Sequence, residues 1–229
     1  MSIKVSAHSI PGSGKSSVIR ELANLMGTDT VTYFEPDEND GKFPWPRAVS
    51  SRQKYGYFGS ITWFRSMRVP LLYDAAKAAS LGKLALIDSY YDKLLYNYIG
   101  KDGLDWFLPR DDAYYTIVEA MAKKDYECLP AADIVICFVI SKPLWRKFLS
   151  MRGREMDKEL EFEKQCFSLQ DQLIKACDKY AKDFDKTVIL FEQDDSSPYI
   201  AAQRLKNLLK ESLCACSYSS SKKQRIYSD

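Results

Sequence analysis

The sequence predicts a single α/β domain with a five-stranded parallel sheet flanked by helices, and three observations support this fold. Short apolar runs rich in β-branched residues alternate with longer segments of helical periodicity, which is the pattern of parallel strands joined by crossover helices. A glycine-containing turn separates the first apolar run from the first helical segment. Polar residues directly follow the apolar runs, and ligands of such sheets bind at the carboxyl ends of the strands.

The elements are assigned in chain order from these patterns. Strands are predicted at residues 3–7, 30–34, 84–87, 134–140 and 187–191. Helices are predicted at residues 15–26, 57–79, 113–124, 143–150, 158–184 and 198–213. The domain is therefore expected to span residues 1–213. The segment 36–52 is irregular and is either a surface loop or a lip over a substrate site.

Composition limits the classes of partner. The chain has 229 residues, of which 46% are hydrophobic, enough for a sizeable core. Its 33 basic and 31 acidic residues leave a net charge of +2, so we predict no nucleic-acid partner. The six cysteines form no Cys-x-x-Cys pair and the chain has one histidine, which argues against a zinc site. Free thiols, and the lack of any signal-like or membrane-spanning run, predict a cytoplasmic protein.

Residues 9–17, Ser-Ile-Pro-Gly-Ser-Gly-Lys-Ser-Ser, are predicted to bind phosphate. The two glycines let several backbone N–H groups point at one anion, Lys15 adds a positive charge, and the Ser16 hydroxyl suits Mg²⁺. Ser9 replaces the glycine of the strict pattern, which predicts a strained first turn. The alternative is a chance turn between a strand and a helix. The residues expected to contact the nucleotide are Pro11, Gly12, Ser13, Gly14, Lys15, Ser16 and Ser17.

Two carboxylates follow predicted strands. Asp88 ends the run 84–87 and is suited to a metal-bound water or an acceptor hydroxyl; alternatively, it caps the next helix. Glu35 precedes Pro36, which restricts Glu35 to an extended backbone. A carboxylate there can accept a proton from a hydroxyl, although a surface glutamate would look the same in sequence.

A third cluster contains Arg146, Arg152 and Arg154 around Gly153. Guanidinium groups suit the oxygens of a phosphoryl group in transfer, and the glycine would let the segment close over it. A solvated basic turn between two helices is the alternative. Beside a phosphate-binding loop, we favour an arginine-rich lid.

Taken together, residues 9–17, 34–36, 86–88 and 151–155 resemble the deoxynucleoside kinase and thymidylate kinase family. The resemblance covers residues 3–213. It implies a P-loop kinase with a three-layer sandwich and an arginine-rich lid. It also implies ATP with Mg²⁺, transfer of the γ-phosphoryl group to a nucleoside or nucleotide, and, as in many relatives, a homodimer.

The resemblance also implies roles for single residues. Lys15 and Ser16 would hold the ATP phosphates and Mg²⁺, with Asp88 as the second metal-side group. Glu35 would be the general base, and Arg152 and Arg154 the lid arginines. The residues expected on the acceptor side are Glu35, Trp45, Tyr57 and Asp88.

Three positions depart from the family pattern. Ser89 stands where both branches have an arginine beside the third-strand carboxylate. Phe34 replaces the arginine that thymidylate kinases place before the Glu-Pro pair, and Gly59 stands where many deoxynucleoside kinases have glutamine. The loss of two cations favours a nucleoside over a monophosphate as acceptor. The alternatives are a thymidylate kinase and a nucleotide-binding module that has lost phosphoryl transfer.

Residues 214–229 are rich in Ser, Lys and Tyr and are predicted to be a disordered tail. Cys214 and Cys216 follow an amphipathic helix and precede basic residues, a pattern that acylation could turn into a membrane anchor. A helix end packed on the domain, followed by a free tail, is the favoured interpretation.

Overall fold

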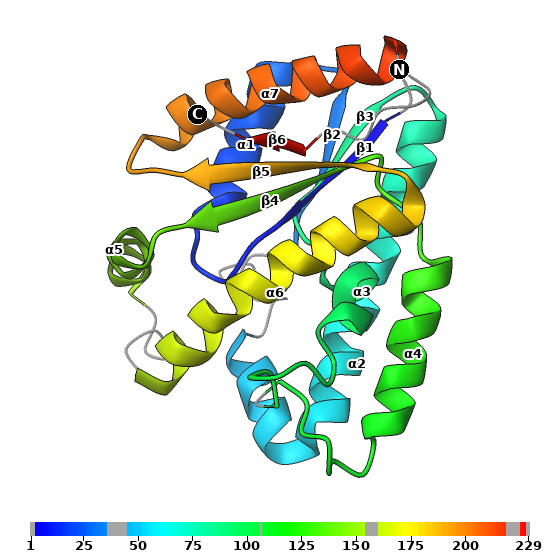
Figure 1. Cartoon of the computed structure of the whole chain (residues 1–229), viewed down its shortest axis with the longest axis vertical. Helices are drawn as coiled ribbons and strands as arrows, with labels where there is room; N and C mark the ends of the chain where they lie inside the picture. Colours follow the sequence, from blue (N-terminus) through cyan, green and yellow to red (C-terminus); the bar gives the residue numbers. More distant parts are fainter. Residues whose placement is uncertain (1–2, 36–44, 106, 154–159, 219–224, 228–229) are drawn as a thin grey trace.

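The computed structural model describes residues 3–35, 45–105, 107–153, 160–218 and 225–227 (Figure 1). Side chains are described for 3–35, 56–105, 107–153 and 164–213. The statements that follow concern these residues. Trp45, Arg154, Cys214 and Cys216, which the sequence analysis singled out, have side chains outside this set.

A six-stranded sheet forms the middle of the molecule, in the order β2-β3-β1-β4-β5-β6, and every neighbouring pair is parallel. Its strands are β1 (Ile3–His8), β2 (Thr30–Tyr33), β3 (Leu84–Ile87), β4 (Ile134–Ile140), β5 (Thr187–Gln193) and β6 (Arg225–Tyr227). The five predicted strands are confirmed. Because β1 lies between β3 and β4, the loop that follows β1 begins at the centre of the sheet.

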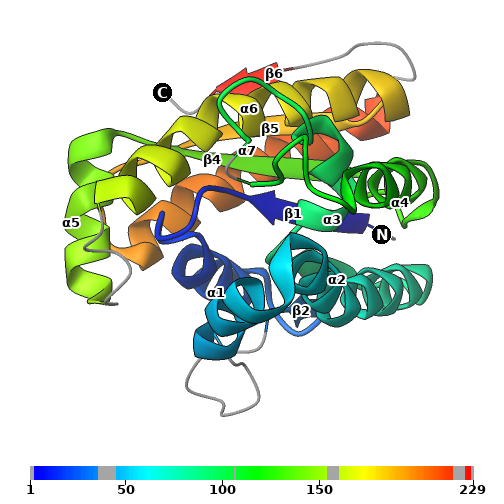
Figure 2. The ribbon, with the colours of Figure 1, turned by 90° about the horizontal axis from the view of Figure 1, so that it is seen from below.

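The helices lie on both faces of the sheet (Figures 1 and 2). They are α1 (Lys15–Met26), α2 (Trp45–Ser80), α3 (Tyr91–Leu94), α4 (Tyr115–Cys128), α5 (Lys142–Arg152), α6 (Leu160–Phe184) and α7 (Pro198–Tyr218), with a 3-10 turn, η2 (Leu95–Asn97). One apolar cluster joins α1 and α7 to the sheet, and another joins α2, α3, α4 and α6 to it.

Strand β4 shows why the sheet needs helices on both faces. Its side chains alternate between the clusters: Val135 and Cys137 belong to the α6-side cluster, and Ile136 and Phe138 to the α1-side cluster. All four are almost completely buried. A strand that is apolar on both faces is typical of parallel sheets, because water reaches neither face.

The structure differs from the prediction in α2 and at the carboxyl-terminal end. Helix α2 starts at Trp45 rather than at residue 57, and Gly56, with φ 73° and ψ −173°, interrupts it. Part of the segment predicted to be a loop or lip is therefore helical. Helix α7 continues to Tyr218, and β6 pairs with residues 188–190 of β5, so the prediction of disorder after residue 213 does not hold there.

Two further properties of the described residues concern membrane-spanning helices and cysteines. Within the described residues, none of the helices combines the length and the apolar character that crossing a membrane requires. The described cysteines are free thiols: Cys128, Cys137, Cys166 and Cys177.

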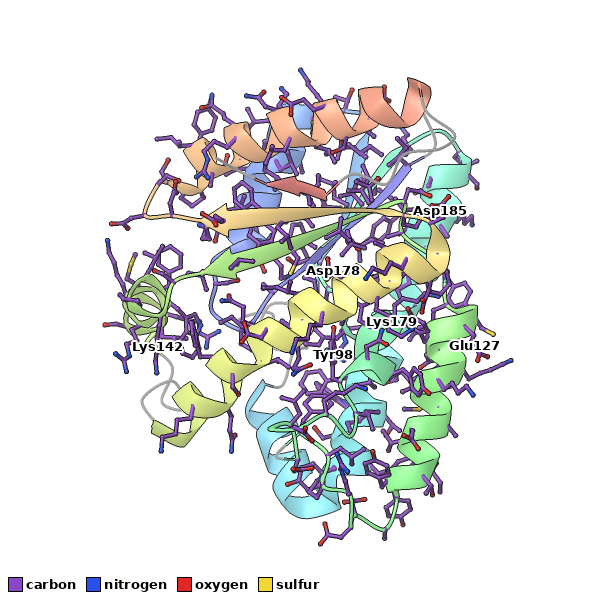
Figure 3. The ribbon with its side chains drawn as sticks, viewed as in Figure 1. Tyr98, Glu127, Lys142, Asp178, Lys179 and Asp185 are labelled. Atoms are coloured by element: carbon purple, nitrogen blue, oxygen red, sulfur yellow. The ribbon has the colours of Figure 1, made fainter. Side chains whose placement is uncertain are left out.

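His8, the single histidine of the chain, is completely buried at the end of β1. Its Nε2 atom lies 2.5 Å from the hydroxyl oxygen of Tyr98, which belongs to the interior beside α6 (Figure 3). Burial, together with the smaller effect of the charges of Lys15 and Arg68, lowers the pKa of His8 from 6.5 to about 3. His8 is therefore neutral in the folded protein at neutral pH.

This lowered pKa predicts that the folded protein begins to lose stability at pH values above those at which carboxylates become protonated. Between pH 6.5 and 3 the unfolded chain binds a proton at His8 that the folded chain does not, so stability falls as pH falls. The expected slope approaches about 1.4 kcal/mol per pH unit. Urea unfolding at intervals from pH 6.5 to 5 measures it, and His8→Gln is the matched variant. An equal slope in both proteins would contradict the assignment to His8.

Candidate active site

The loop between β1 and α1 has the backbone of an anion site. Gly12 and Gly14 have φ of 81° and 80°, in the left-handed region that favours glycine. Gly14 is the N-cap of α1 and no side chain caps this helix, whose first turn has no acidic residue. The first N–H groups of α1 are thus directed at the space in front of the loop, where the helix dipole favours an anion. Ser9 is not in the left-handed region, so the strain expected there is absent.

Helix α5 lies directly against this loop. A Cβ atom on Gly12 would lie 2.5 Å from Leu149 Cδ2 and 3.4 Å from Arg152 Cζ, and one on Gly14 would lie 3.1 Å from the Phe148 ring. The indole N–H of Trp145 donates to the Pro11 carbonyl at 2.7 Å. Glycine is therefore favoured at both positions by φ, and a larger residue would also have to displace side chains of α5.

This packing brings Arg152, the last residue of α5, to the loop. Arg154 and residues up to 159, the rest of the segment predicted to form a lid, lie outside the described residues. Arg146 also belongs to α5.

Asp88 binds the two polar side chains that begin α1. Lys15 Nζ is 2.6 Å from Asp88 Oδ1 and also donates to the Asp88 carbonyl oxygen. The Ser16 hydroxyl donates to Asp88 Oδ2 at 2.9 Å. The alternative that Asp88 caps the following helix is wrong, because Tyr90 is the N-cap residue of α3.

The residues around the loop fit a magnesium nucleotide. Ser13 Oγ and Gln193 Oε1 are buried without a hydrogen-bond partner, and Gln193 Nε2 lies 3.6 Å from the position of a Cβ on Gly14. Unpartnered polar atoms beside a phosphate-type loop indicate that a polar ligand completes their bonding. Ser16 and Asp88 supply one hydroxyl and one carboxylate. In the described part of the chain no group of three or more His, Cys, Asp or Glu side chains could hold a metal ion.

Glu35 follows β2, and Asp88 follows β3 at the same edge of the sheet. The Asp88 N–H donates to the Tyr33 carbonyl at 3.0 Å. This hydrogen bond extends the pairing of β2 and β3 as far as the residues that carry the two carboxylates. The Glu35 side chain is partly exposed, and its Oε1 lies 3.4 Å from Arg68 Nη1. The arrangement therefore places a carboxylate with an arginine partner next to the phosphate loop.

Arg68 is the functional residue that the sequence analysis missed. Besides Glu35, it binds Asp92 of α3 through Nε at 2.7 Å and Nη2 at 3.3 Å. Burial alone would lower the pKa of Arg68, but the negative charges of Asp92 and Glu35 outweigh burial and raise it. Arg68 lies in the middle of a helix, in no motif, and only its position among apolar residues could have drawn attention to it.

Arg68 supplies a guanidinium group that the sequence analysis considered lost. Ser89, at the position of the family's arginine, is buried and its hydroxyl has no partner. Phe34, the second departure, packs into the α1-side cluster and has Arg20 Cζ 4.2 Å from its ring centroid. A guanidinium group is thus present beside Glu35, but it comes from α2.

Contacts of α2 keep Arg68 in place. Arg65, three residues earlier, binds both carboxylate oxygens of Asp125 on α4, at 2.5 and 2.7 Å. Tyr57, predicted on the acceptor side, packs from α2 against the α6-side cluster.

No family model matches the chain, and no curated protein sequence matches it. Among solved structures, deoxyadenosine kinase from M. mycoides with the products dCMP and a flexible dCDP has 18% identity and a TM-score of 0.60. The same enzyme with bound dATP has 17% identity and a TM-score of 0.59. Each match covers 91% of this chain and 100% of the other. The chain therefore has the fold of a deoxynucleoside kinase-like P-loop kinase.

Proposed function

We propose that this protein transfers the γ-phosphoryl group of ATP to a hydroxyl group of a deoxynucleoside. One observation carries the proposal: the Glu35–Arg68 pair and the Lys15–Asp88–Ser16 group lie at the ends of neighbouring strands. The first is suited to an acceptor hydroxyl and the second to a phosphate donor. The structures with similar folds are of a kinase described with nucleotides bound, which supports the same class of ligand.

The donor side would work through fixed positive groups. Lys15 and the loop N–H groups would bind the phosphates, and Ser16 and Asp88 would hold Mg²⁺, which neutralises charge on the phosphate oxygens. Lys15 would exchange its contact with Asp88 for one with phosphate. Arg152, at the end of α5, would add a guanidinium group to the phosphoryl group in transfer.

The acceptor side would work through Glu35. Its carboxylate would accept the proton of the hydroxyl as the oxygen attacks phosphorus. Arg68 lies beside Glu35, with Nη1 3.4 Å from Glu35 Oε1, and this contact would hold the carboxylate in place. Trp45 and Tyr57 remain the aromatic candidates for contacts with the nucleoside, and Arg154 remains a candidate for the lid.

The charges near Arg68 favour an uncharged acceptor. Among the described residues, Arg68 is paired with two carboxylates, Glu35 and Asp92, so its charge is already more than balanced. A monophosphate would bring further negative charge to this position. The thymidylate kinase alternative is therefore less well supported than a nucleoside kinase.

The second alternative is a module that binds nucleotide without transferring phosphoryl groups. The site retains Lys15, Ser16, Asp88 and Glu35 in contact with partners, which supports activity. We also propose a cytoplasmic location, because the described cysteines are free thiols, which fit a reducing compartment. Calorimetric binding of ATP without measurable transfer to any nucleoside would favour the module.

Replacing the base tests the role of Glu35. We expect Glu35→Gln to lower kcat about 100- to 10,000-fold, because the amide cannot accept the proton. The KM for ATP should change little, since the loop is untouched. Transfer of radiolabel from ATP to deoxynucleosides measures both constants.

Glu127→Gln is the matched control, because Glu127 is exposed on α4 far from the loop (Figure 3). It should leave kcat unchanged. Full activity of Glu35→Gln, or an equal loss in both variants, would contradict the assignment of Glu35.

The choice of acceptor tests the charge argument. We expect deoxynucleosides to exceed their 5′-monophosphates in kcat/KM by at least about tenfold, equivalent to about 1.4 kcal/mol of lost acceptor binding. The assay compares each of the four deoxynucleosides with its monophosphate at fixed ATP. A preference for any monophosphate would instead support the thymidylate kinase alternative.

A further inference from the structure

Tyr91, the first residue of α3, contacts both halves of the site. Its hydroxyl donates to the carbonyl oxygen of Ser9, the first residue of the phosphate loop, at 2.7 Å. Its ring centroid lies 5.6 Å from Arg68 Cζ. No motif in the sequence drew attention to Tyr91.

The surroundings of Tyr91 leave it little freedom. Its ring packs edge-on against His8, with 4.5 Å between the ring centroids, and also contacts Tyr98. The next residue, Asp92, binds Arg68. Burial raises the pKa of the Tyr91 hydroxyl, so it stays protonated and remains a donor to Ser9.

The contact also bears on the unusual residue at position 9. Ser9 is almost completely buried, so its carbonyl cannot exchange this hydrogen bond for one to bulk water. The Tyr91 hydroxyl gives that carbonyl a partner and joins the start of the loop to α3. Without the hydroxyl, the loop would lose a fixed point directly before the residues that bind phosphate.

We propose that Tyr91 is a positioning residue that sets the phosphate loop and the Arg68–Glu35 pair at the correct separation for phosphoryl transfer. The inference rests on the proposed function and deepens it. Tyr91 has two separable parts: the hydroxyl fixes the loop, and the ring supports the guanidinium group of Arg68. Loss of the hydroxyl should change the KM for ATP, and loss of the ring should change the KM for the deoxynucleoside.

Two variants separate the parts. Tyr91→Phe removes only the hydroxyl, and we expect it to raise the KM for ATP about fivefold, with less than a twofold change for the deoxynucleoside. Tyr91→Leu also removes the ring, and should raise the KM for the deoxynucleoside about threefold or more as well. Tyr91→Met takes its place if the leucine variant does not fold.

Tyr90→Phe is the matched control. Tyr90 is almost completely buried, and its hydroxyl contacts Pro130, Ala132 and Tyr180 rather than the loop. Loss of this hydroxyl should lower the unfolding temperature and leave both KM values within twofold. A structural role alone would make Tyr91→Phe behave in the same way.

The outcomes are distinct. An unchanged KM for ATP in Tyr91→Phe, or the same change in Tyr90→Phe, would overturn the role of the hydroxyl. An unchanged deoxynucleoside KM in the leucine or methionine variant would overturn the role of the ring. If the unaltered chain phosphorylates no deoxynucleoside, the proposed function fails instead; the fivefold effect on ATP affinity, measured by calorimetry, would still test the contact with Ser9.

Discussion

The carboxylate of Asp88 is the group on which the geometry of the site depends, because it binds Lys15 and Ser16 at the same time. Lys15 and Asp88 are both largely buried, and a buried charge without a partner is strongly destabilising. The pair therefore joins the end of β3 to the start of α1. A ligand that offers phosphate to Lys15 and a cation to Asp88 would keep every charge partnered, which makes this contact compatible with both the free and the bound protein.

Arg68 is the centre of a second set of contacts. It joins Glu35, which follows β2, to Asp92 of α3, and α2 carries it. The end of β2, helix α2 and helix α3 therefore meet at one guanidinium group. A guanidinium group can bind two carboxylates at once because it offers five N–H donors in a fixed plane. The departure at Ser89 therefore does not remove the cation from this part of the site. Tyr91 links the two centres, since it touches both Arg68 and the loop.

Residues of the loop and of the strand ends were predictable, and Arg68 in the middle of α2 was not. Lys15 and Ser16 were identified from the glycine-containing loop pattern. Glu35 and Asp88 were identified because parallel strands end at one edge of the sheet, so their positions in sequence imply a common position in space. Arg68 carries no such signal, because the side of a long helix that meets the site depends on packing. The addition of β6 to the edge of the sheet likewise depends on contacts with another part of the chain.

The order of residues is sufficient to predict the five central strands, the crossover helices, the phosphate loop and the two carboxylates beside it. These features follow from local periodicity, from glycine at positions of positive φ and from the common direction of the strands. The tertiary structure decides that Asp88 binds Lys15 rather than capping α3, that the cation beside Glu35 is Arg68, and that Tyr91 reaches Ser9. The residues joined by these contacts lie far apart in the sequence: the smallest separation is 23 positions, between Arg68 and Tyr91, and the largest is 82, between Tyr91 and Ser9. Only the packing of the helices on the sheet brings them within bonding distance.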